Sequence, residues 1–227
     1  MANHLDLEEQ EQLDQLKHFW KQYGNLITWA LIVVLGSVAA WNGYNMWQRN
    51  QSVQAAAMYD EVEKVVRGGD LQKAERAFVD MRDRFSKAVY TQQAGLLVAK
   101  MAYEAGKMDS AKSTLSWLSD NAADKGYASV ARLRLSAVLI EGKAYDEALK
   151  LLESGIAEEF AALADDRKGD IFTLKGKKAE AKAEYQKAYK AFDEQTEYRR
   201  LVSVKLNALG FDPEADAKIA ANNEVAK

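Results

Sequence analysis

Residues 174–185 read LKGKKAEAKAEY, and this stretch carries the pattern that decides the fold. Gly176 follows an apolar run and stands between lysines, where a left-handed backbone ends one helix and turns the chain. In the helix that follows, Ala181, Tyr185 and Ala188 recur at i, i+4 and i+7, so they share one face. The stretch therefore predicts two antiparallel helices joined by a tight turn.

Small residues also lie on the first helix of this hairpin. Gly169 and Phe172 precede Ala181 by 12 and 9 residues. Small side chains at Gly169, Ala181 and Ala188 let two helices approach closely. We expect the aromatic rings, Phe172 among them, to fill the space between successive hairpins.

The pattern occurs three more times, at RGGDLQKAERAF (67–78), EAGKMDSAKSTL (104–115) and EGKAYDEALKLL (141–152). In each copy we expect the glycine to supply the left-handed turn. The alanines packed inside the second helices recur at intervals of 37, 37 and 33 residues: Ala74, Ala111, Ala148 and Ala181. A period of about 34 residues is typical of tetratricopeptide repeats. Because no copy has the full Trp-Leu-Gly-Tyr opening of that consensus, the repeats are degenerate, and the alternative is an α-helical domain without true repeats.

Good helix formers dominate the chain, and its one proline is Pro213. We therefore predict an all-α protein in which residues 49–209 form a degenerate tetratricopeptide-like solenoid of helical hairpins. A half-polar helix near residues 197–209 is expected to cap its open end. Residues 210–227 are polar and are expected to form a flexible tail.

No charged residue stands between Lys21 and Arg49, and residues 22–48 are predicted to be a single transmembrane helix. As a helix, its apolar centre, residues 26–47, is about 33 Å long, which matches a hydrocarbon core of about 30 Å. Aromatic residues that favour the headgroup level lie toward its ends: Trp29, Trp41, Tyr44 and Trp47. No glycine or proline separates Gly43 from the first hairpin, so the membrane helix is expected to continue into it.

The span is interpreted as an uncleaved anchor. Ser37-Val38-Ala39 resembles a signal cleavage site, and cleavage is the alternative. Residues 1–21, however, form a long acidic tail, and apolar residues continue past that site. By the positive-inside rule, Lys17 and Lys21 weakly favour a cytoplasmic N-terminus. Arg49 on the other side of the span nearly balances them, so the rule hardly distinguishes the two orientations.

Two small-xxx-small pairs lie within the span, Gly36 with Ala40 and Ala39 with Gly43. Such pairs let membrane helices pack closely. They predict that the anchor pairs with another membrane helix or with itself. The alternative is that these small residues are merely common in such spans.

The composition of the domain argues against several classes of function. Residues 49–227 carry 29 basic and 29 acidic residues, and this balance argues against a nucleic-acid partner. There is no cysteine, and the two histidines, His4 and His18, precede the span. Thiolate, imidazole and triad chemistry are therefore not available in the domain. No phosphate-binding loop is present, so we expect no enzyme activity, no cofactor and no small-molecule substrate.

Two groups of residues in the domain could still carry chemistry. The spaced aromatic residues are interpreted as core rather than as a ligand cage: Trp117, Tyr127, Tyr145, Tyr185 and Tyr189. Asp165, Asp166 and Asp170 lie near Arg167 and Lys168 and could hold a metal ion. A solvated, charge-compensated helix start is favoured, because acidic residues are stabilising in a first turn.

Two segments resemble the YfgM family of Gram-negative bacteria: HFWKQYGN (18–25) before the span and DRKGDIFTLKGKKAEAKAEY (166–185) in the last hairpin. The resemblance implies a bacterial inner-membrane protein with a cytoplasmic N-terminus and a periplasmic C-terminal domain. It implies an ancillary subunit of the SecYEG translocon that associates with the periplasmic chaperone PpiD. The expected function is a non-enzymatic adaptor that helps newly translocated proteins reach periplasmic chaperones.

Two other functions compete with the adaptor. One is a membrane-tethered regulator that sequesters a signalling or stress-response protein on its repeat surface. The other is a hydrolase of unusual type.

Overall fold

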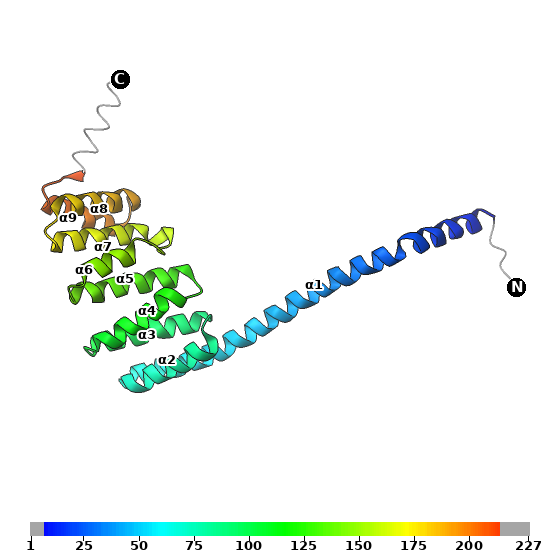
Figure 1. The fold of residues 1–227 in the computed structure, drawn as a ribbon, viewed down its shortest axis with the longest axis horizontal. Helices are drawn as coiled ribbons and strands as arrows, with labels where there is room; N and C mark the ends of the chain where they lie inside the picture. The colour runs from blue at the N-terminus through cyan, green and yellow to red at the C-terminus, as the bar shows by residue number, and fades with distance from the viewer. Residues whose placement is uncertain (1–6, 214–227) are drawn as a thin grey trace, which may run out of the picture. The chain divides into compact units, whose positions relative to one another are not determined.

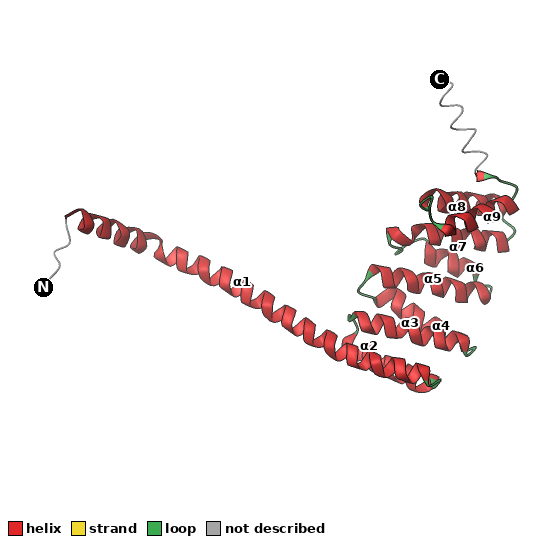
Figure 2. Cartoon of the chain, turned by 180° about the vertical axis from the view of Figure 1, so that it is seen from behind, coloured by secondary structure: helices red, strands yellow, loops and turns green. Residues whose placement is uncertain are grey.

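The computed structural model describes residues 7–213 of the chain. This part consists of helices and loops and contains no strand, which confirms the predicted all-α fold (Figure 2). The chain divides into two compact units, Met1–Gln51 and Ser52–Lys227. Helix α1, Leu7–Arg67, runs through the division, so the expected continuation of the membrane helix into the first hairpin is present.

The second unit is a series of helices that pack on their neighbours in chain order (Figure 1). The end of α1 pairs with α2, α3 with α4, α5 with α6 and α7 with α8, and α9 follows as the last helix described. The bounds of these helices after α1 are α2 Leu71–Phe85, α3 Val89–Glu104, α4 Met108–Asn121, α5 Lys125–Glu141, α6 Tyr145–Leu152, the 3-10 helix η1 Glu158–Phe160, α7 Ala161–Leu174, α8 Lys178–Ala191 and α9 Glu197–Ala208.

The four hairpin turns share one hydrogen-bond pattern. In the turn between α7 and α8, Gly176 N–H donates to the Thr173 carbonyl at 3.0 Å, and Lys177 N–H donates to the Phe172 carbonyl at 2.9 Å. This is the Schellman arrangement, which requires a left-handed residue at its centre. Gly176 has φ +71°, and Gly69 and Gly106 have φ values of +77° and +70° in the first two turns. The repeat pattern therefore has a common backbone geometry.

The third turn differs from the sequence-based prediction. Gly142 is not the left-handed residue: its φ is −74°, and Lys143 takes that place with φ +58°. The Schellman bonds of this turn run from Lys143 and Ala144 to Ile140 and Leu139, both at 2.9 Å. The expected role of Gly142 was wrong because the register of the bonds, rather than the position of the glycine, selects the left-handed residue.

Three buried apolar clusters hold the hairpins together. The first joins the end of α1 to α2 and α3, the second joins α3 through α7, and the third joins α8 to α9. One fully buried alanine from each second helix lies five residues after the left-handed residue of its turn: Ala74, Ala111, Ala148 and Ala181. Because an alanine fills this place in every hairpin, the two helices can pack closely each time.

The last helix, α9, packs on α8 through Val202 and Leu206, which are fully buried. The expected tail begins at residue 210, but Phe211 packs against the same cluster and its ring lies 4.1 Å from the Lys182 ammonium. Pro213 is also buried. The remainder of the expected tail, residues 214–227, lies outside the described residues.

Candidate functional surfaces

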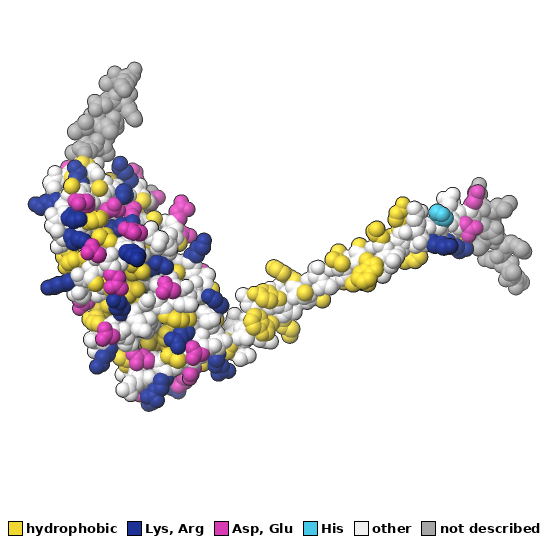
Figure 3. All heavy atoms as spheres, viewed as in Figure 1, with side chains coloured by type: hydrophobic (Ala, Val, Ile, Leu, Met, Phe, Trp, Pro, Cys, Tyr) yellow, Lys and Arg dark blue, Asp and Glu magenta, His cyan; other side chains and the backbone are white. Residues whose placement is uncertain are grey.

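Helix α1 is the one helix in the described range that is long and apolar enough to cross a membrane. Its most apolar window has a mean hydropathy of 1.7, and only 6% of that window is buried. The aromatic residues near the ends of the predicted span are exposed: Trp29, Trp41, Tyr44 and Trp47. The apolar side chains along this part of α1 project outward (Figure 3). Such a surface needs lipid or another helix to cover it.

The small residues of the span leave an open strip on this helix. A methyl group added at Gly36 or Gly43 would meet no atom within 4 Å, and Ala39 and Ala40 are exposed. Two hydroxyl groups of the span are satisfied within the helix, since Thr28 donates to the Gly24 carbonyl and Ser37 to the Val33 carbonyl, both at 2.7 Å. The strip therefore offers close backbone approach without a polar group that lacks a partner.

Gly169 is the described glycine that a neighbouring side chain approaches most closely. A methyl group added there would lie 2.4 Å from the Tyr185 ring, which α8 lays directly against α7. Ala181 and Ala188 are fully buried beside that ring, and Phe172 packs against the same cluster. The small and aromatic residues predicted from the last repeat thus meet in one place.

The interpretation as a solvated helix start was wrong for Asp166 and Asp170 of α7, whereas Asp165 pairs with Lys168 at 3.0 Å as the compensated charges indicated. The Asp166 side chain is 2% exposed and both of its oxygens accept hydrogen bonds from Lys205 of α9 at 2.8 Å. Tyr198 of α9 also donates to Asp166, at 2.9 Å. Asp170 accepts a bond of 2.7 Å from Lys205 and one of 2.8 Å from Tyr185. The two aspartates therefore bind α9 to α7.

This polar cluster also raises the pKa values of its tyrosines. Burial is the main cause for Tyr198, with the charge of Asp166 second, and together they raise its pKa to about 12. Burial likewise raises the pKa of Tyr185 well above its ordinary value. Both phenols are neutral hydrogen-bond donors at physiological pH, so the cluster is structural rather than an acid–base site.

Sequence reasoning missed Lys205 and Tyr198. Lys205 lies 39 residues after Asp166, so no local spacing connects the two. A signal was nevertheless present: Lys205 directly precedes Leu206 on the face of α9 that also carries Val202. A lysine at the edge of a buried stripe is expected to find a carboxylate partner.

Most of the spaced aromatic residues lie in or against the core. The Trp117 ring makes an edge contact with Phe78 at 5.7 Å, and Tyr145 and Tyr189 pack against the buried clusters. Tyr127 differs, because its hydroxyl accepts a hydrogen bond of 2.7 Å from Gln93 of the neighbouring hairpin. No cage of aromatic rings around an open space is present among these five residues.

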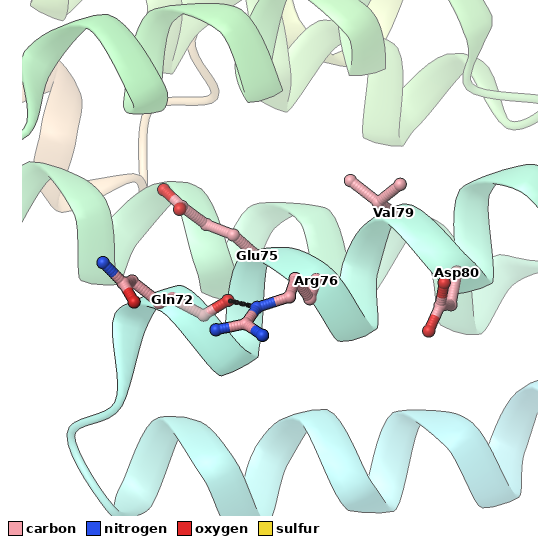
Figure 4. A pocket seen from close by; sticks show the side chains of 5 residues that line it. All are labelled: Gln72, Glu75, Arg76, Val79 and Asp80. Atoms are coloured by element: carbon pink, nitrogen blue, oxygen red, sulfur yellow. Dashed lines mark hydrogen bonds between the residues drawn. The ribbon is translucent and has the colours of Figure 1, made fainter.

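The surface clefts of the repeat domain are shallow and carry mixed charge. One of about 400 Å³ follows α2 and is lined by Gln72, Glu75, Arg76, Val79 and Asp80 (Figure 4). The Arg76 guanidinium donates to the Gln72 carbonyl at 3.3 Å, and Glu75 accepts a hydrogen bond from Ser110 of α4. These groups are engaged with the protein itself, and charges of both signs are scattered among apolar and uncharged side chains over the visible face (Figure 3). The five residues that line this cleft do not place a nucleophile beside a base.

Among the described side chains of residues 11–213, no group of three or more His, Cys, Asp or Glu could hold a metal ion. The aspartates of α7, which were the candidates from the sequence, are engaged by Lys205 instead.

Comparison with known families agrees with this architecture. A family model described as a tetratricopeptide repeat-like domain matches residues 17–211. The match covers most of the chain, so the protein belongs to this class of helical-repeat proteins.

Curated relatives define the family within that class. A Haemophilus influenzae protein named ancillary SecYEG translocon subunit is 31% identical over 205 residues, which are 89% of this chain and 98% of the relative. A Neisseria gonorrhoeae protein of the same name is 29% identical over 213 residues, 92% of this chain and 100% of the relative. An Escherichia coli protein of that name is 24% identical over 204 residues, 88% and 96% of the two chains. The chain belongs to the family of ancillary SecYEG translocon subunits, which confirms the resemblance to the YfgM family.

Proposed function

We propose that this protein is a membrane-anchored, non-enzymatic adaptor of the Sec translocon. In this proposal α1 places the chain beside SecYEG in the bacterial inner membrane, and the repeat domain passes newly translocated proteins to periplasmic chaperones such as PpiD. The observation that carries the proposal is the match over about nine-tenths of the chain to relatives named ancillary SecYEG translocon subunit.

The repeat domain suits an adaptor because it provides surface without chemistry. Its hairpins stack into an extended array, which is how solenoid proteins present large binding faces. Its acidic and basic residues balance, so binding would depend on shape and local contacts rather than on a strong field. A hydrolase would need a nucleophile and a base in reach of each other, and the five residues that line the cleft along α2 include no such pair.

The open strip of the span is the proposed contact with the translocon. Gly36, Ala39, Ala40 and Gly43 lie on one side of α1 and are uncovered. In a membrane, small residues let two backbones approach, so dispersion contacts and weak backbone hydrogen bonds can form. A helix of the translocon is the partner that the relatives' names favour.

Co-purification from gently solubilised membranes tests the proposal. The intact chain should retain SecYEG subunits and a PpiD-like chaperone, and a chain without residues 1–48 should lose SecYEG. A matched control replaces the span by an unrelated single-pass helix of equal length. If this control retains SecYEG as well as the intact chain does, the proposed role of the span is wrong.

Topology separates the adaptor from a membrane-tethered regulator. A reporter fused after Leu209 should be active only in its periplasmic form, because the adaptor needs its domain on the side where chains emerge. A cytoplasmic domain would remove the periplasmic handover and favour a regulator that holds a signalling protein.

A further inference from the structure

Helices α5, α7 and α9 are neighbours and share one exposed face of the repeat domain. Helix α7 contacts α5, and the ion pairs of Lys205 with Asp166 and Asp170 hold α9 beside α7. Because Lys205 reaches Asp170, the side chains one turn from each of them lie on adjoining strips of α9 and α7. The ion pairs therefore identify the sides of these two helices that form the shared face.

Three large apolar side chains of this face are uncovered. Leu174 follows Asp170 by one turn of α7, and Leu201 and Val204 lie four and one residues before Lys205 on α9. Val204 is 60% exposed, Leu174 is 55% exposed and Leu201 is 46% exposed. Exposed apolar residues that gather beside polar groups mark a surface for binding a partner.

Two arginines border these apolar side chains. Arg167 lies one turn before Asp170 on the same side of α7, and Arg134 of α5 precedes Arg167 by 33 residues. The buried alanines of the same two hairpins are also 33 residues apart, so the arginines occupy equivalent places. The Arg134 guanidinium donates to the Leu96 carbonyl of α3 at 3.3 Å. Among the described residues, neither arginine has a carboxylate within ion-pair distance.

The carboxylates on this side of α5 and α7 are already engaged. Lys205 binds the two aspartates of α7, and Glu141 of α5 accepts a hydrogen bond of 2.8 Å from Tyr103 of α3. Glu197 is exposed at the start of α9, one turn before Leu201. The charge that lacks a counter-charge is therefore positive toward α5 and α7, and a guanidinium is well suited to bind a carboxylate.

We propose that this face binds an amphipathic segment of a partner polypeptide that carries carboxylates beside apolar side chains. The partner's carboxylates pair with Arg134 and Arg167, and its apolar side chains cover Leu174, Leu201 and Val204. A basic segment of the same shape lacks these ion pairs and meets two cations instead. The inference rests on the proposed adaptor function, because it names the chemistry of the polypeptide that the repeat domain receives.

Two fluorescent amphipathic peptides test this chemistry directly. They share their apolar residues, and their polar positions are glutamate in one and lysine in the other. Each is titrated against the full-length protein in phosphatidylcholine nanodiscs, and binding to empty nanodiscs is subtracted. We expect the acidic peptide to bind about fivefold more tightly, which is the preference that two exposed ion pairs provide. Equal affinities, or tighter binding of the basic peptide, would overturn the proposal.

Charge variants locate the binding face. The preference for the acidic peptide should disappear when Arg134→Gln and Arg167→Gln are combined. The matched control combines Arg76→Gln with Lys178→Gln, which removes the same charge from α2 and from the start of α8. This control should keep the preference. A preference that survives without Arg134 and Arg167, or that is lost equally in the control, would contradict the assigned face.

An apolar variant tests the other half of the surface. Val204→Asp should weaken binding of the acidic peptide severalfold, because it places a carboxylate where the partner's apolar side chains lie. Val79→Asp is the control, since Val79 is an exposed valine of α2. It should leave the affinity unchanged, and equal losses in the two variants would exclude this face.

SecYEG retention in native membranes separates this inference from the adaptor function on which it rests. The variant without Arg134 and Arg167 should retain SecYEG, because its span is unchanged. Loss of SecYEG from the unmodified chain would refute the adaptor, whereas equal binding of the two peptides would refute only the assigned face.

Discussion

Removing the Lys205 ammonium should weaken the attachment of α9 to α7 far more than removing the charge of a lysine whose partner is exposed. Lys205 makes three contacts of 2.7–2.8 Å with Asp166 and Asp170. Without it, the Asp166 side chain, which is 2% exposed, keeps only the hydrogen bond from Tyr198. Breaking a buried ion pair from one side costs about 3–5 kcal/mol. Because the Lys205 side chain is itself 23% exposed, we expect about 3 kcal/mol, at the lower end of that range.

The assay is native-state hydrogen exchange on the full-length protein in mild detergent, read on peptides from α9. A loss of about 3 kcal/mol corresponds to opening that is roughly 150-fold more frequent in Lys205→Met. The double variant with Asp166→Asn removes both charges and should recover about 2 kcal/mol. Lys175→Met is the matched control, because Lys175 pairs with Asp146, whose side chain is 89% exposed, and it should leave α9 unchanged. The reasoning is refuted if Lys205→Met and Lys175→Met behave alike.

Three further predictions concern the backbone, the packing and the pH dependence of the repeat domain. Lys143→Gly should stabilise the protein by about 0.5–1 kcal/mol in urea unfolding, because Lys143 has φ +58° and a left-handed backbone is costly for any residue with a Cβ; a loss of stability would contradict this. Gly169→Ala should lower the free energy of unfolding by about 1–3 kcal/mol in the same assay, because the new methyl group would lie 2.4 Å from the Tyr185 ring. An unchanged unfolding midpoint would contradict the close approach of the Tyr185 ring to Gly169. Burial raises the pKa of Tyr198 from its ordinary 10.0 to about 12, so the stabilisation by its neutral phenol is complete below pH 10 and is lost as pH rises through 12. Between pH 10 and 12 the melting temperature should fall less steeply with pH in Tyr198→Phe than in the unmodified protein. Identical slopes would exclude stabilisation by the neutral Tyr198 phenol.

The sequence predicts the hairpins well because each depends on local features. A glycine beside charged residues, an alanine a few residues later and an apolar residue one turn beyond suffice to place a turn and two helices. The last repeat shows this most clearly, since Gly169, Ala181 and Tyr185 meet as their spacing indicates.

The features that the sequence did not reveal depend on register and on distance along the chain. Lys143 takes the left-handed position because the Schellman bonds count from Leu139 and Ile140, although a glycine stands one place earlier. The attachment of α9 joins Lys205 to Asp166 over 39 residues. From sequence alone, Asp166 and its neighbours are indistinguishable from a solvated first turn, because burial by a later helix is a tertiary effect.

For the membrane span, too, the sequence reveals the local features but not the partner. The uncharged run that marks the span and its small residues can be seen directly in the sequence, and Gly36 and Gly43 are indeed uncovered in the structure. The partner that covers them cannot be inferred from spacing, because small residues permit contact with any helix of suitable shape. The family of the chain supplies the candidate.

Site-specific photo-crosslinking from the span in native membranes tests the central claim most directly. A photoreactive residue at Gly36 or Ala39 faces the open strip, and one at Val34 or Val38 lies on the opposite side of the same helix turns. The adaptor account predicts adducts with a SecYEG subunit from Gly36 and Ala39 and mainly lipid adducts from Val34 and Val38. Lipid adducts alone from all four positions would contradict it.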